Sequence, residues 1–196
     1  MNKSTNEKGA TLIEVLGVLC IVATIAAGAY AGISRMNQKI KLTQAHAEVS
    51  NLVKDIRTHF SSSRPATISA KQLYDLGILK NINDEETAAA NVYGGEIRVL
   101  WKEINGNPAF SIDYYNVPPK ACIDLLMADW GNDPSSGLYT IYVAPYGPNY
   151  KAFYWKKDFP NCETDSYMHC LPPSFEDASE ECTRAQAGAM TWEYYL

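Results

Sequence analysis

Apolar positions dominate the start of the chain. From Ala10 to Ile33 the sequence is apolar almost throughout, and Glu14 is its one carboxylate. A helix needs roughly 20 apolar residues to cross a hydrocarbon core about 30 Å thick, so this run predicts a membrane-spanning helix. A charge at the centre of such a span costs roughly 2.5 to 3.5 kcal/mol. The Glu14 side chain therefore either extends to the interface or has a partner.

Helical spacing continues beyond the apolar run. Apolar residues recur among polar ones at Ile33, Met36, Ile40, Ala47, Leu52 or Val53, Ile56 and Phe60. This pattern predicts one helix of about 50 residues, with a membrane half at 10–33 and an amphipathic half at 34–62. Pro65 ends it, because the residue before a proline avoids the helical region. Gly28 and Gly32 form a small-xxx-small pair that permits close helix packing, although such pairs also occur by chance in membrane spans.

Residues 63–196 alternate between strand and helix signals and predict a globular head. Helices are expected from Ser69 to Gly77 and from Pro118 to Gly131. Strands are expected at 95–104, 109–115, 138–145, 151–156 and 191–196. Asn105-Gly106 joins the first two as a type I′ hairpin. Residues 88–90 and the acidic stretch 163–181 are expected to be loops. The predicted architecture is α+β, with the long helix packed on an antiparallel sheet.

Composition and charge narrow the possible partners. The chain has 196 residues, of which 46% are hydrophobic and 20% charged, and a formal net charge of −5. This length accommodates one membrane segment and one globular domain. No cluster of Lys and Arg forms the basic surface that a nucleic-acid partner requires.

The cysteines indicate an oxidising compartment. Cys20 lies in the apolar run, which leaves Cys122, Cys162, Cys170 and Cys182 in the head. An even number of cysteines behind an export-type segment predicts two disulfides, and the sequence leaves three pairings open. The charges that flank the span disagree with the cysteines about the orientation in the membrane. Three cations follow the span (Arg35, Lys39 and Lys41) and two precede it, which favours the orientation opposite to that of an exported head.

Three stretches of the sequence resemble a known family. Residues 8–15, KGATLIEV, resemble the processing motif of type IV pilins and pseudopilins, in which a short charged leader ends in Gly and the fifth residue beyond it is Glu. Residues 91–99, NVYGGEIRV, and 117–125, VPPKACIDL, resemble the Gly-Gly strand opening and the P-x-x-A-C helix of type IVb pilins, including those of thin conjugative pili.

The resemblance implies a role for the first residues. Residues 1–9 would be a leader removed after Gly9, Ala10 would become an N-methylated amino terminus, and Glu14 would neutralise the amino terminus of a neighbouring subunit. A desolvated carboxylate and ammonium compensate each other, and removing one partner of such a buried pair costs about 3 to 5 kcal/mol. The resemblance also implies that Cys122 pairs with Cys182 and Cys162 with Cys170.

The function implied is that of a structural, non-enzymatic subunit of a type IVb-like pilus of a Gram-negative bacterium, used in adhesion, aggregation or conjugation. Its partners would be copies of itself or related pilins, a prepilin peptidase and an inner-membrane assembly platform. The head would be periplasmic before assembly, and the pilus extracellular after it. No cofactor or metal is implied.

Other interpretations remain open. The chain could be a type II secretion pseudopilin. It could be a secreted domain cleaved by an ordinary signal peptidase near residue 30, where Ala27-Gly28-Ala29 fits a small-x-small site. His169 and Cys170, with Cys162, could hold a metal or act as a thiol site, but they lack the spacing of known motifs.

Two surface features allow more than one interpretation as well. The acidic stretch 163–181 could contact neighbouring subunits through Lys151, Lys156 and Lys157, or it could be a solvated face. Several aromatic residues between Tyr139 and Trp155 could form an adhesive surface, but strands commonly use such residues for packing.

Overall fold

The computed structural model describes residues 12–60, 69–83, 85–131, 136–144, 151–155, 158–162, 168–185 and 188–196. The chain divides into two compact units, Met1–Ile40 and Lys41–Leu196. The boundary falls within one continuous helix, α1, which runs from Leu12 to Phe60.

The part of α1 before Lys41 includes most of the segment 10–33 that is expected to span a membrane. α1 has 49 residues without a proline, and its described side chains from Ile13 to Ile40 are exposed. By length and composition it can cross a membrane.

The part of α1 after Ile40 packs in the head with a phase that differs from the predicted one. Its buried face consists of Ala45, Val49, Leu52, Val53 and Ile56. The predicted stripe ran through Ile33, Met36, Ile40 and Ala47, but these side chains are exposed. At about 100° per residue they lie on roughly the opposite side of the helix from the buried face. The single predicted stripe is therefore two stripes on two faces.

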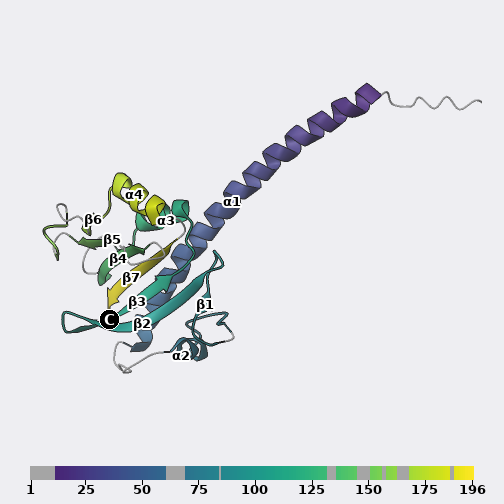
Figure 1. The fold of residues 1–196 in the computed structure, drawn as a ribbon. Coiled ribbons are helices and arrows are strands. Elements are labelled where there is room, and N and C mark those ends of the chain that lie inside the picture. Colours follow the sequence, from purple (N-terminus) through teal and green to yellow (C-terminus); the bar gives the residue numbers. More distant parts are fainter. Residues whose placement is uncertain are drawn as a thin grey trace, which may run out of the picture. The chain divides into compact units, whose positions relative to one another are not determined.

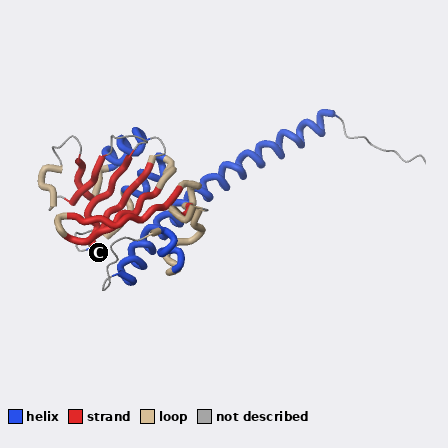
Figure 2. Tube along the Cα trace, turned by 60° about the horizontal axis from the view of Figure 1, so that its bottom comes forward, coloured by secondary structure: helices blue, strands red, loops and turns tan. Residues whose placement is uncertain are grey.

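The head contains one seven-stranded sheet in the order β1-β2-β3-β7-β4-β5-β6 (Figures 1 and 2). The strands are β1 (Ala89–Ala90), β2 (Glu96–Ile104), β3 (Asn107–Tyr114), β4 (Leu138–Ala144), β5 (Lys151–Trp155), β6 (Met168–Leu171) and β7 (Ala189–Tyr195). Neighbouring strands are antiparallel except for the parallel pair β5 and β6. The predicted α+β class with a largely antiparallel sheet is confirmed.

Three shorter helices share a hydrophobic core with α1 on one face of the sheet. They are α2 (Ala70–Asp75), α3 (Pro119–Leu126) and α4 (Phe175–Ala185). The predicted capping box of α2 is present, since Ser69 Oγ accepts from the Gln72 amide and the Gln72 side chain accepts from the Ser69 amide. The predicted hairpin is also present: Asn105 and Gly106 both have positive φ, as a type I′ turn requires.

Aromatic residues fill both sides of the sheet. Trp192 is fully buried in the main core, where its ring lies 5.0 Å from that of Trp130. On the opposite face Tyr139 and Tyr154 pack against Phe159 in a smaller cluster. These tyrosines are less than 10% exposed, so packing explains them better than adhesion does. Tyr146 and Tyr150 lie outside the described residues.

Three local predictions were wrong. The segment expected as an acidic loop contains β6 and most of α4, and residues expected as a loop form β1. α4 begins where the Ser174 hydroxyl accepts from the Asp177 amide, which is an ordinary helix start. α3 ends at Leu126 rather than near Gly131, because the Trp130 indole donates to the Leu125 carbonyl at 2.6 Å as the chain turns.

Candidate functional site

The candidate site begins at Glu14, in the first turn of α1, where its side chain is exposed. Successive residues of a helix are about 100° apart, so Gly17, Gly28 and Gly32 lie within an arc of about 60° that also contains Glu14. A Cβ built on any of these three glycines meets nothing within 4 Å. One face of the helix thus combines a carboxylate with three positions where another helix can approach closely. Gly17 was missed in the sequence, although counting its angle from Glu14 would have found it.

The predicted processing residues lie outside the described residues. Gly9 and Ala10 precede Leu12, the first residue of α1. The cleavage and methylation expected there therefore remain predictions.

Arg57 ties the end of α1 to the C-terminal strand. Its guanidinium donates to the Tyr195 carbonyl at 2.8 Å and to the Ser136 carbonyl at 2.6 Å, and it lies over the Tyr194 ring. Gly137 makes room for it, since a Cβ there would overlap with Arg57 Nη2. Each of these hydrogen bonds has a charged donor, which makes it stronger than a neutral one.

A second polar tie joins α1 to β3. The Tyr114 hydroxyl donates to Glu48 Oε2 at 2.6 Å. Burial raises the pKa of Glu48, and the hydrogen bond from Tyr114 partly opposes that rise. Burial also raises the pKa of Tyr114 far above its usual value, so this hydroxyl stays protonated and remains a donor. Together with Arg57, this bond holds residues 41–60 of α1 within the head.

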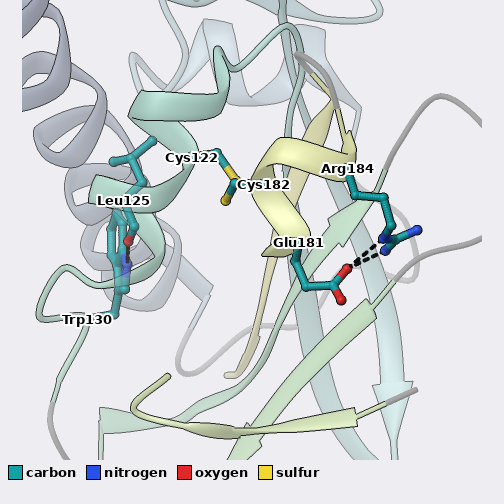
Figure 3. Close-up of a disulfide and its surroundings, with 6 residues drawn as sticks. All are labelled: Cys122, Leu125, Trp130, Glu181, Cys182 and Arg184. Carbon is teal, nitrogen blue, oxygen red and sulfur yellow. Dashed lines mark hydrogen bonds and ion pairs between the residues drawn. A yellow bond between two sulfur atoms is a disulfide. The ribbon is translucent and has the colours of Figure 1, made fainter. Parts of the chain in front are cut away.

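The four head cysteines form two disulfides, Cys122 with Cys182 and Cys162 with Cys170. These are the same pairs that the family resemblance implies. Figure 3 shows Cys122 on α3 and Cys182 on α4 facing each other across the gap between the two helices. Both are buried, so this bridge lies within the core. Cys20 is a free, exposed cysteine on α1.

His169 lies in a polar cluster beside the Cys122–Cys182 bridge. Glu181 on α4 is 2% exposed and pairs with Arg184, towards which it points in Figure 3. His169 Nε2 lies 3.4 Å from Glu181 Oε1, and Nδ1 lies 3.5 Å from Asp177 Oδ1. The hypothesis of a metal or thiol site at His169 gains no support. Cys162 and Cys170 form a disulfide, and the described residues contain no metal-binding group of three or more His, Cys, Asp or Glu side chains.

The head also has a groove of about 300 Å³ beside α1. Its polar lining includes Glu48, Asn51, Asp55, Lys80 and Asn81. The described residues that line it include the carboxylates Glu48 and Asp55 and no Ser, Thr, Cys or His.

No protein-family model matches the chain, and no curated protein matches it either. Among solved structures, the chain is similar to the type IVb pilin from Salmonella typhi. The TM-score is 0.49 and the sequence identity 19%, over 80% of this chain and 98% of the pilin chain.

Proposed function

We propose that this chain is a structural subunit of a type IV pilus-like filament. It would be inserted in the membrane through residues 10–33, cut after Gly9, methylated at Ala10 and assembled through α1. The head, residues 63–196, would be periplasmic before assembly and would lie on the filament surface afterwards. A prepilin peptidase and an inner-membrane assembly platform would be its partners.

One observation carries the proposal: a single helix has two different environments along its length. Before Lys41 it exposes an apolar surface with one carboxylate and three glycines on one face. After Ile40 it is part of the core of a disulfide-bonded head. An exposed apolar surface of this length requires lipid or other helices around it. In a filament of packed helices, other helices take the place of the lipid around this surface.

Glu14 has a defined role in this proposal. In the apolar interior of a filament its carboxylate would pair with the amine of Ala10 on a neighbouring subunit. The glycine face would let the two helices approach closely enough for that contact. Losing one partner of a buried ion pair costs about 3 to 5 kcal/mol, which is sufficient to prevent stable packing.

Intact-mass analysis of the chain from a membrane that contains a prepilin peptidase tests the first step. The proposal expects a chain that begins at Ala10 and carries one added methyl group. A chain that begins near residue 30 would instead support the secreted-domain interpretation and reject the filament. The same analysis of a Gly9→Val variant provides the control, because it should retain the leader.

A further inference from the structure

The exposed apolar stripe on α1 is unexplained by the contacts of the head. This outer stripe consists of Ile33, Met36, Ile40 and Ala47. The first three are 59%, 66% and 46% exposed, and Ala47 is exposed as well. The four residues lie within about 60° of one another on the helix, away from the face that is buried in the head. Most of the stripe follows Ile33, the last residue of the proposed membrane half.

The charges that flank the outer stripe have one sign. Arg35, Lys39 and Lys41 are the charged residues between Val15 and His46, and this segment contains no Asp or Glu. On the helix Lys39 lies on one side of the outer stripe and Lys41 on the other. The segment 33–47 thus presents an apolar strip bordered by cations.

The head carries an apolar patch that could receive the outer stripe of another copy. We call Met127, Pro172, Pro173 and Phe175 the α3–α4 patch. Met127 is 47% exposed and Phe175, the first residue of α4, is 65% exposed. Met127, Pro172 and Pro173 line a cleft of about 90 Å³ whose lining also includes the buried residue Trp155. This volume equals that of about three water molecules and can accept the end of one long apolar side chain.

Exposed carboxylates lie on α3 and α4 and directly after α3. Asp124 on α3 and Asp129 after it are exposed, as are Glu176 and Glu180 on α4. Within the described part of the chain, Glu176 and Glu180 make no ion pair. They lie one helical turn apart on the exposed side of α4, where they can meet two cations on a partner helix.

We propose that the α3–α4 patch of one copy binds the outer stripe of a second copy, with Glu176 and Glu180 facing the cations of that stripe. In this contact the two apolar surfaces meet. Cations border the outer stripe and carboxylates border the patch, and the pairing of opposite charges sets the register and excludes other orientations. An amphipathic helix in an apolar groove is a common mode of recognition. The inference rests on the proposed function, since it identifies one interface of the filament.

Photo-crosslinking tests the contact directly. A benzoylphenylalanine at position 175 replaces one exposed aromatic side chain with another and leaves the core unchanged. Full-length chains labelled with ¹⁴N and ¹⁵N are mixed in one membrane, so that peptides joined between copies can be recognised by mass. The inference expects products that join position 175 to residues 33–47 of another copy. Products located elsewhere, or no product between copies, would overturn it.

Charge reversal tests the register. Glu176→Lys with Glu180→Lys should lower the yield of this product about tenfold, because attraction becomes repulsion. Lys39→Glu with Lys41→Glu should do the same, and the four changes together should restore it. The matched control is Glu85→Lys with Glu103→Lys, which makes the same charge change at exposed positions elsewhere on the head and should leave the yield unchanged.

Three outcomes distinguish this inference from a lipid partner and from the proposed function. If anionic lipid is the partner of the cations, reversal at Lys39 and Lys41 lowers the yield, reversal on α4 has no effect and the combination is not rescued, which overturns the inference. Filaments without the predicted crosslink would retain the filament and reject this interface. The crosslink without filaments would retain the interface and reject the filament.

Discussion

Removing the Cys122–Cys182 disulfide should destabilise the head more than removing Cys162–Cys170. The first bridge closes a loop with a sequence separation of 60 residues, whereas the second has a separation of 8. In the chain-entropy model these loops contribute about 4.3 and about 2.5 kcal/mol, a difference of about 1.8 kcal/mol. The longer loop contains β4, β5 and β6, so its removal frees more of the unfolded chain.

The matched variants are Cys122→Ala with Cys182→Ala and Cys162→Ala with Cys170→Ala. Each removes one bridge and two sulfur atoms, and three of the four cysteines are almost fully buried, so the cavity effects are similar. Urea unfolding of the full chain in detergent, followed by the fluorescence of the core residues Trp130 and Trp192, gives the free energies. Limited proteolysis should cut α4 first in the Cys122 variant. Equal losses of stability, or a larger loss in the Cys162 variant, would show that loop closure does not control the stability of this head.

Three further predictions concern single residues. Glu14→Gln should leave the head folded and inserted in the membrane but reduce the yield of sheared filaments, whereas Glu14→Asp should retain part of it; a wild-type yield for the Gln variant would show that the ion pair is unnecessary. Gly137→Ala should cost about 3 kcal/mol in urea unfolding, since it combines a positive φ of 75° with displacement of Arg57, and Gly106→Ala, with a φ of 76° in open space, should cost only about 1 to 2 kcal/mol. Tyr114→Phe should destabilise the head more at pH 7 than at pH 4. Because the pKa of Glu48 is raised in the folded head, the free energy of unfolding falls as pH rises and this carboxylate ionises. Tyr114→Phe removes a hydrogen bond to the carboxylate and raises this pKa further, so the loss is larger at pH 7. The pH dependence of this loss should disappear in a Glu48→Gln background.

The sequence predicted elements best where local chemistry decides the structure. Asn105-Gly106 determined the hairpin because both residues accept positive φ, and Ser69 with Gln72 determined the start of α2. α4 was missed because Glu176, Asp177, Glu180 and Glu181 made the segment look like a solvated loop. Its burial depends on long-range partners, since Ala178 and Cys182 pack in the core and Glu181 pairs with Arg184 and His169. A short-range pattern does not contain those contacts.

The phase of α1 was the more consequential error, because it hid a second surface. Ile33, Met36 and Ile40 have the same helical spacing as Val49, Val53 and Ile56, so a search for apolar residues three or four positions apart joins them into one stripe. Accumulating 100° per residue separates them onto opposite faces, and their exposures of 46% or more against at most 9% agree with that separation. A helix that only anchored a head would need one apolar face after the membrane. α1 has two in succession, and one of them is filled by its own head. The other has cations on both sides, which an acidic, partly apolar surface complements, and the α3–α4 patch of a second copy is the surface that we propose for it.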